Sequence, residues 1–185
     1  MSDLKQAIKQ NYIKCAKEPS YFINQYCTIQ HPQRGKIKFK LYPFQYEVLK
    51  EYQENDYNVI LKSRQLGIST LSAAYSLWMM LFQNDKNILV IATTKDTAKN
   101  LITKVRVMYE GLPAWLKTAI VENNKLSLTF KNGSQIKAIA SNESAGRSEA
   151  LSLLILDEAA FIEKIDTIWT AAQQTLATGG RCLAI

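Results

Sequence analysis

The stretch "YNVILKSRQLGIST", residues 57–70, decides how this chain folds. Its apolar start predicts a strand over 57–62, and the run "STLSAAYSLWMMLF" predicts a helix over 69–82 that is buried on most sides. The loop between them leads straight into the helix. Such a loop offers unpaired backbone N–H groups and the positive end of a helix dipole, and both attract phosphate. We therefore interpret residues 62–69 as a candidate phosphate-binding loop.

The loop departs from the usual nucleotide-binding pattern G-x-x-x-x-G-K-[ST], whose lysine neutralises the outer phosphates. Gly67 and Ser69–Thr70 are in register with that pattern, but Ile68 stands where the lysine belongs. Because Ile68 is apolar and β-branched, we expect it to pack beneath the helix. We expect Lys62 to act as a displaced lysine and Arg64 as a second phosphate contact. For each of these two cations, the alternative is a side chain that simply faces solvent.

A second motif follows in "LSLLILDEAA", residues 151–160. The near-continuous apolar run predicts a buried strand that ends in Asp157 and Glu158. An aspartate at such a strand end holds a hydrated Mg²⁺, and a neighbouring glutamate orients and deprotonates an attacking water. The alternative is a helix N-cap. Ligands bind beyond the carboxyl ends of parallel strands, so we expect these acids to converge with the loop.

Two further residues fit an ATPase. Gln45 follows "LYPF" upstream of the loop, and a glutamine amide pairs with both the N6 and N7 edges of adenine. A glutamine on a helix surface is the alternative. Arg147 lies in the small-residue stretch "SNESAGRSEA", where it is placed to act in cis or in trans on charge that develops at the γ-phosphate. An exposed loop arginine is the alternative there.

The rest of the chain alternates apolar strands with helices. The further elements that we expect are a helix over 2–17, a strand over 37–42, a helix over 43–54, a strand over 87–93, a helix over 94–112, a hairpin over 125–140 that turns at Asn132–Gly133, and a strand from residue 181. This alternation predicts an α/β fold with a central, mostly parallel sheet flanked by helices. We divide the chain into an N-terminal helical extension over 1–36 and a core over 37–185.

The net charge of +7 is unevenly spread. Residues 1–50 carry nine Lys or Arg against three acids, residues 101–140 carry six against two, and residues 141–185 carry three against six. Two basic segments suit a polyanion such as DNA, and the acidic part suits a metal site; a solvated basic face is the alternative. No apolar run reaches the roughly 18 residues of a membrane span. Three distant cysteines indicate reduced thiols, and the lone His31 argues against zinc.

Together "LYPFQY", "SRQLGIST", "SAGRS" and "LLILDEAAFIE" resemble the N-terminal ATPase domain of bacteriophage terminase large subunits. The resemblance implies a P-loop NTPase fold of the ASCE (RecA-like) class that uses ATP and Mg²⁺. It implies that Ser69 and Asp157 hold the metal, that Glu158 is the catalytic base and that Arg147 is an arginine finger. It also implies an adenine contact for Gln45. The expected nucleotide contacts in the loop are Ser63, Gln65, Leu66, Gly67, Ile68, Ser69 and Thr70.

The family's activity is the coupling of ATP hydrolysis to translocation of double-stranded DNA into a procapsid. The resemblance therefore implies a phage or prophage protein of the host cytoplasm, with DNA-backbone contacts that do not read sequence. It implies a portal, a small terminase subunit and a homo-oligomeric ring as partners. Most members keep the usual lysine at the position of Ile68, and some carry a displaced lysine at the loop entrance, which Lys62 matches. The family continues with a coupling motif and a nuclease domain that this sequence does not reach, so we expect weak ATPase activity and no DNA cleavage.

Two alternatives stay open. A superfamily 2 helicase-like fragment shares the adenine-contacting glutamine and the D-E-x-x motif, but it normally needs the loop lysine and a second motor domain. A non-enzymatic module with a decayed nucleotide site retains only DNA or protein binding, and Ile68 is the best evidence for it. Nucleotide binding by the wild type and by Lys62→Ala separates this module from an ATPase.

Overall fold

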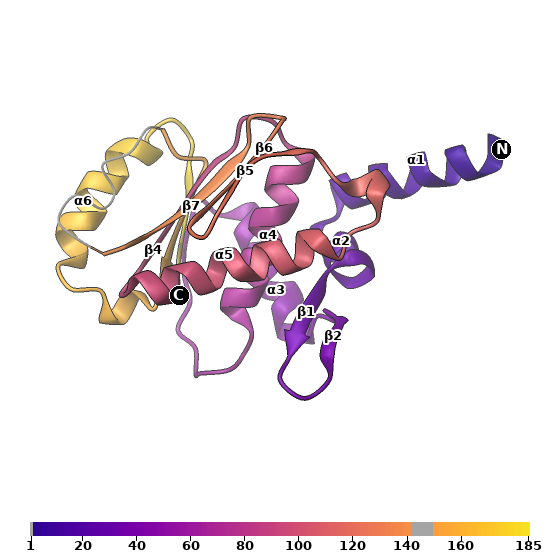
Figure 1. The fold of residues 1–185 in the computed structure, drawn as a ribbon. Helices are drawn as coiled ribbons and strands as arrows, with labels where there is room; N and C mark the ends of the chain where they lie inside the picture. The colour runs from indigo at the N-terminus through magenta and orange to yellow at the C-terminus, as the bar shows by residue number, and fades with distance from the viewer. Residues whose placement is uncertain (1, 142–149) are drawn as a thin grey trace.

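A seven-stranded sheet forms the centre of the computed structural model, which describes residues 2–141 and 150–185 (Figure 1). From one edge to the other the strands are β3 (Tyr57–Val59), β9 (Arg181–Ala184), β8 (Leu153–Asp157), β4 (Asn87–Ala92), β7 (Gln135–Ala140), β6 (Ser127–Phe130) and β5 (Ile120–Asn124). Neighbouring strands are parallel from β3 to β7, whereas β6 and β5 pair antiparallel. The prediction of a mostly parallel sheet is therefore confirmed.

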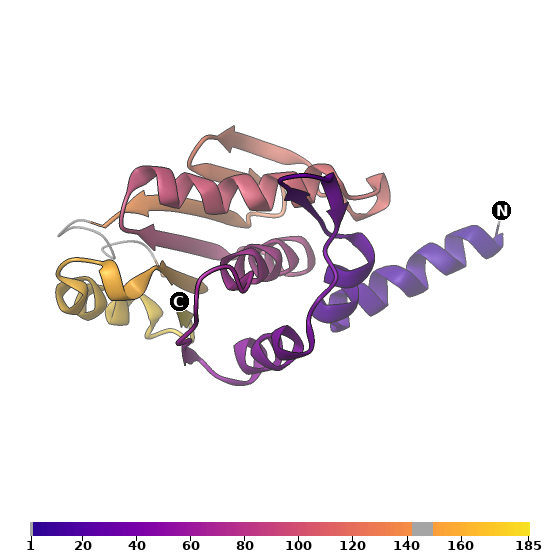
Figure 2. The same ribbon diagram turned by 90° about the horizontal axis from the view of Figure 1, so that it is seen from below.

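Side chains of the sheet alternate between its two faces. Ile88 and Val90 belong to one core cluster, whereas Leu89 and Ile91 belong to another, as the two-residue period of a strand requires. The helices over the first face are α3 (Pro43–Glu54), α4 (Ile68–Phe82) and α5 (Lys95–Glu110). Helix α6 (Ile165–Leu176) covers the second face, and Figure 2 shows it lying apart from α4 and α5. Because both faces are buried at the centre of the sheet, β4 and β8 read as nearly continuous apolar runs.

The carboxyl ends of the parallel strands meet at one edge of the sheet. The backbone N–H of Ile60 donates to the carbonyl of Ala184 over 2.9 Å, and the N–H of Ala159 donates to the carbonyl of Ile185 over 2.8 Å. These bonds tie the loop that follows β3, and the segment that follows β8, to the end of β9. The loop and the acids therefore meet at this edge, as predicted.

The N-terminal elements precede this sheet in the chain. Helix α1 (Ser2–Lys17) extends away from the body (Figure 1), and it is anchored where Cys15 is buried and its carbonyl accepts a 2.8 Å hydrogen bond from Trp78 Nε1. The next elements are α2 (Pro19–Tyr26) and the antiparallel pair β1 (Thr28–His31) and β2 (Gly35–Lys38). The expected division between residues 36 and 37 falls within β2. Phe22 and Phe39, from either side of it, share one core cluster with α4.

The strand expected over 37–42 is wrong beyond Lys38, where β2 ends. Phe39 and Leu41 are buried, as the alternation predicted, but this stretch is a connection into α3. The backbone N–H of Leu41 donates to the side-chain oxygen of Asn24 over 3.0 Å, so a side chain takes the place of a neighbouring strand.

The other predicted elements are confirmed with small shifts at their ends. The strand expected over 57–62 ends at Val59, and the helices expected over 69–82 and 94–112 are α4 and α5. The hairpin of β6 and β7 turns through Gly133, whose φ is +80°. The elements that were not predicted are α2, β1, β5, α6 and two short helical turns, at Ala114–Leu116 and Ala159–Phe161. In the described part of the chain, no helix combines the length and the apolarity that crossing a bilayer requires.

Candidate functional site

The loop between β3 and α4 ends in Gly67, the N-cap of α4, which has a left-handed backbone with φ 72° and ψ 13°. Glycine adopts this conformation readily because it has no Cβ. Gln65 also has a positive φ, of 65°, so the loop turns sharply before the helix begins. Gly67 supplies no side-chain cap to the first N–H groups of α4, among them those of Ile68 and Ser69. The start of α4 therefore presents the arrangement that binds phosphate.

Ser69 and Asp157 join the start of α4 to the end of β8. Ser69 Oγ donates a hydrogen bond to Asp157 Oδ1 over 2.8 Å, and Asp157 is only 5% exposed. A hydroxyl and a carboxylate are the oxygen ligands that Mg²⁺ prefers, and Mg²⁺ at phosphate sites takes few protein ligands and keeps several waters. Within residues 2–141 and 150–185, no three His, Cys, Asp or Glu side chains form a metal cage. The pair therefore fits Mg²⁺ that is bound together with substrate phosphates.

A cavity of about 230 Å³ lies beside the loop at the carboxyl edge of the sheet. Lys62, Arg64 and Glu158 line it, so the structure brings two predicted cations and the predicted catalytic carboxylate together. The remaining lining residues are Val59, Ile60, Leu61, Ala159, Ala160, Phe161, Ala184 and Ile185. Neither Lys62 nor Arg64 forms an ion pair with a described residue. Both cations are therefore available to an anionic ligand.

Glu158 adopts a left-handed backbone, with φ 56° and ψ 44°, directly after β8. It precedes the short helical turn Ala159–Phe161, but its side chain makes no capping hydrogen bond, so the alternative of an N-cap carboxylate is not supported. The described non-glycine residues with positive φ are Gln65, Asp85, Glu158 and Lys164. Two of these four lie at this site. Such conformations cost about 1–3 kcal/mol each and gather at functional sites.

Residues 59–181, more than half of the chain, match the protein family described as terminase large subunit, T4likevirus-type, N-terminal. This chain belongs to that family. The matched range contains the whole loop and both acids of the site. The Ser69–Asp157 contact therefore lies in the part of the chain that carries the family likeness.

Solved terminases share the fold of this terminase domain. The large terminase of bacteriophage HK97 matches with a TM-score of 0.71 and 20% identity, over 91% of this chain and 36% of that chain. The large terminase ATPase domain of Thermus phage P74-26 matches with a TM-score of 0.59 and 22% identity, over 80% and 64% of the two chains. A large terminase of a thermophilic bacteriophage in complex with ADP matches with a TM-score of 0.58 and 18% identity, over 77% and 37%. The chain thus spans 36% of the HK97 protein.

Gln45 approaches the loop of this terminase domain from α3. It is 1% exposed, so the alternative of a surface glutamine is wrong. Its Oε1 accepts a hydrogen bond from the backbone N–H of Tyr42 over 3.1 Å, and its Nε2 donates to the carbonyl of Leu66 over 2.9 Å. Both ends of the amide therefore bind protein backbone. The adenine contact implied by the resemblance stays a prediction.

The remaining predicted residues occupy different surroundings in this terminase domain. Ile68 is 2% exposed and belongs to the core, which confirms that its side chain packs beneath the helix. Thr70 lines another cavity, of about 180 Å³, between α4, α5 and β1. The exposed loop side chains are those of Ser63, Arg64, Gln65 and Leu66. Arg147 lies outside the described residues. Two exposed residues that line the cavity were not predicted: Leu61, which adjoins Lys62 in the chain, and Phe161, which follows Glu158 by three positions.

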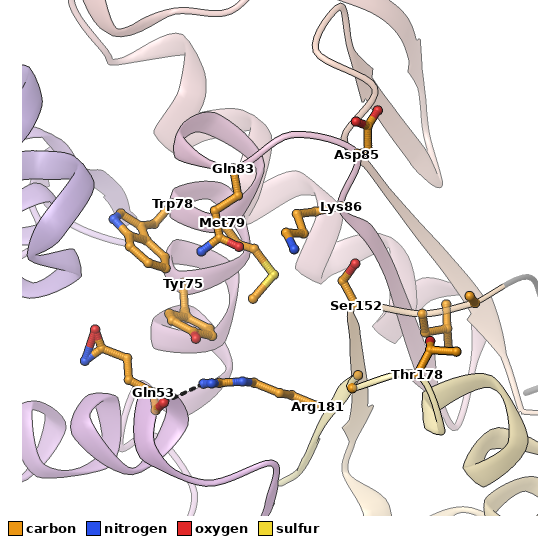
Figure 3. Close-up of a pocket in the computed structure, with 14 residues that line it drawn as sticks. Gln53, Tyr75, Trp78, Met79, Gln83, Asp85, Lys86, Ser152, Thr178 and Arg181 are labelled. Atoms are coloured by element: carbon orange, nitrogen blue, oxygen red, sulfur yellow. Dashed lines mark hydrogen bonds between the residues drawn. The ribbon is translucent and has the colours of Figure 1, made fainter.

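A larger cavity, of about 550 Å³, lies at the amino ends of the parallel strands, on the side of the sheet opposite the loop (Figure 3). Lys86, Ser152 and Arg181 line it at the amino ends of β4, β8 and β9. The Arg181 guanidinium donates to the carbonyls of Tyr52 and Gln53, over 2.6 and 2.8 Å, at the end of α3. A cation there complements the negative end of the helix dipole. We interpret Arg181 as a clamp between α3 and β9, and none of the predicted site residues lines this cavity.

Proposed function

We propose that this domain binds ATP with Mg²⁺ at the loop over 62–69 and hydrolyses it, as the ATPase part of a DNA-packaging terminase. The observation that carries the proposal is the 2.8 Å hydrogen bond from Ser69 to Asp157, which sets a hydroxyl and a buried carboxylate together at an uncapped helix start. Family membership supports it. Relatives of the same fold have been solved in complex with ADP and with ATP-γ-S.

The loop binds the substrate through its phosphates. The uncapped N–H groups at the start of α4 hydrogen-bond phosphate oxygens, and the helix dipole favours their negative charge. Lys62 and Arg64 line the adjoining cavity without ion-pair partners among the described residues, so both offset the charge of the outer phosphates. In this role Lys62 replaces the lysine that the usual pattern places at position 68.

Glu158 carries the chemical step. Glu158 lines the cavity together with both cations, and there its carboxylate orients a water and accepts its proton. Ser69 and Asp157 would hold Mg²⁺, which neutralises phosphate charge when it is bound. Arg147 acts across a subunit boundary in a ring and stabilises the charge that develops at the γ-phosphate.

The proposed motor acts on DNA. Lysines and arginines of residues 1–50 and 101–140 contact the phosphate backbone of double-stranded DNA without reading sequence, and the protein acts in the host cytoplasm. A portal, a small terminase subunit and further copies of the chain complete the assembly. ATP turnover at the loop then drives translocation.

Exchange of Glu158 for glutamine tests the proposal. Because glutamine keeps the shape but cannot accept the proton, Glu158→Gln should retain Mg²⁺-dependent binding of ATP-γ-S and lose ATP turnover by about 100-fold or more. Glu163→Gln is the control, since Glu163 is an exposed glutamate of the same segment. Phosphate release and calorimetric binding are measured on all three proteins. Undiminished turnover by Glu158→Gln would show that the role assigned here is wrong.

A second candidate is a binding module whose nucleotide site has decayed. The buried side chain of Ile68 favours it, because it stands where the usual pattern has the lysine that reaches the outer phosphates. Such a module binds neither ATP nor ATP-γ-S. Absence of nucleotide binding by the wild type would therefore favour this candidate.

A further inference from the structure

We propose that Gln45 is a positioning residue that holds the phosphate loop in its binding conformation and does not read the base. The inference rests on the proposed function of the loop as a nucleotide site. It differs from the adenine contact that the family resemblance implies for the same residue.

One amide joins two elements that are distant in the chain. Gln45 lies in the first turn of α3, where its Oε1 accepts a hydrogen bond from the N–H of Tyr42 and completes the N-cap. Its Nε2 donates to the carbonyl of Leu66, 21 residues later, over 2.9 Å. The amide therefore has one end in the start of α3 and the other in the phosphate loop.

The loop residue next to Leu66 is packed tightly against the same amide. A Cβ built on Gly67 would lie 2.9 Å from Gln45 Nε2, closer than real Cβ contacts allow. Gly67 also has a φ of 72°, so the Leu66–Gly67 peptide is restrained by a hydrogen bond, by contact and by its backbone conformation. The N–H groups of α4 follow directly after this peptide. A shift of the peptide would turn them away from phosphate, and displacements near 1 Å are enough to weaken such sites.

The amide is in no position to read a base. The Gln45 side chain is 1% exposed, so an adenine edge has no access to its remaining N–H or lone pair. The aromatic residues Tyr42, Phe44 and Tyr46 around it in the chain are exposed, and the rings of Tyr42 and Phe44 are stacked with centroids 5.9 Å apart and planes at 7°. Aromatic faces stack on any base. We therefore expect ATP and GTP to bind with similar affinities.

The experiment isolates the bond to the loop. Gln45→Glu keeps the size of the side chain and its acceptor for Tyr42, but a carboxylate cannot donate to Leu66. Gln53→Glu is the matched control, because it makes the same charge change later in the same helix. Dissociation constants of fluorescent ATP and GTP analogues with Mg²⁺ are measured for the wild type and both variants. Hydrogen exchange of the amides over 66–70 is measured without nucleotide.

Gln45→Glu should raise the dissociation constants of the ATP and GTP analogues by the same factor, about tenfold or more. It should also speed hydrogen exchange of the amides over 66–70. Gln53→Glu should change neither. Gln45→Leu fills the same space without hydrogen bonds and takes the place of Gln45→Glu if that variant does not fold. If Gln45→Glu loses ATP binding but keeps GTP binding, Gln45 reads the base and the inference is wrong. If Gln45→Glu binds both nucleotides as tightly as the wild type does, Gln45 has no positioning role. If the wild type binds neither nucleotide, the proposed function fails, while unchanged exchange over 66–70 would overturn this inference separately.

Discussion

Ser69 at the start of α4 donates a 2.8 Å hydrogen bond to Asp157 at the end of β8, although 88 residues separate them in the chain. The contact exists because β3 and β8 run parallel in one sheet, with β9 between them, so that their carboxyl ends lie at the same edge. An uncapped helix start and a buried carboxylate thereby lie next to each other. Under the proposed function, this one side-chain pair would link the binding of Mg²⁺ to the binding of phosphate.

Ser69→Ala should weaken nucleotide binding in the presence of Mg²⁺ by about tenfold, because one metal ligand is lost. Binding measured in EDTA should change little, since the backbone N–H groups of α4 remain. Isothermal titration with ATP-γ-S under both conditions makes the comparison. Ser76→Ala is the control, because Ser76 Oγ bonds to the carbonyl of Ser72 within the same helix. An equal loss with and without Mg²⁺ would contradict the metal role of Ser69.

Gly67→Ala should abolish tight nucleotide binding. Its Cβ would meet Gln45 Nε2 at 2.9 Å and would strain a backbone with φ of +72°. Gly35→Ala is a matched control, since Gly35 has a φ of +67° but nothing within 4 Å of the added Cβ. In both variants the free energy of unfolding should fall by about 1–2 kcal/mol, because alanine is strained in the left-handed conformation. Urea unfolding and nucleotide titration are measured on both, and normal nucleotide affinity in Gly67→Ala would refute the expectation.

The three thiols should make the protein sensitive to alkali. Burial raises the pKa of Cys15 from 9.0 to about 11 and of Cys182 from 9.0 to about 12, and it also raises the pKa of Cys27. Above pH 9 the unfolded chain loses thiol protons that the folded chain keeps, so the free energy of unfolding falls as pH rises. The loss should approach about 1.4 kcal/mol per pH unit for each such thiol.

Urea midpoints between about pH 8 and pH 10.5 test this alkaline loss of stability. Cys182→Ala should show a shallower decline than the wild type, because one group with a raised pKa is gone. The same slope in both proteins would mean that the Cys182 thiol does not contribute.

Much of the fold was predictable from short-range pattern. The strand, loop and helix over 57–82 follow from two apolar runs around "KSRQLG", and β8 follows from an apolar run that ends in two acids. Helix α6 also left a signal. Ile168, Ala172 and Leu176 recur every four residues and are buried on the second face of the sheet. A short stripe of this kind was too weak to be recognised without the sheet that it covers.

The parts that failed depend on partners far away in the chain. Phe39 and Leu41 alternate as in a strand, but a strand needs a neighbour, and Leu41 finds Asn24 instead. Gln45 suits adenine by residue type, and that contact stays a prediction. Its bond to Tyr42 is a local contact at the start of α3, whereas its bond to Leu66 follows from how α3 packs against the loop, which no local pattern encodes.

We propose above all that Lys62 performs the task of the lysine that Ile68 replaces. Calorimetric titration of Mg²⁺ and ATP-γ-S into the wild type and Lys62→Ala tests it most directly, with Lys86→Ala as the control from the cavity at the opposite edge. We predict tight binding by the wild type and by Lys86→Ala, and binding weakened at least about tenfold in Lys62→Ala. Binding by Lys62→Ala that is as tight as that of the wild type would contradict the claim.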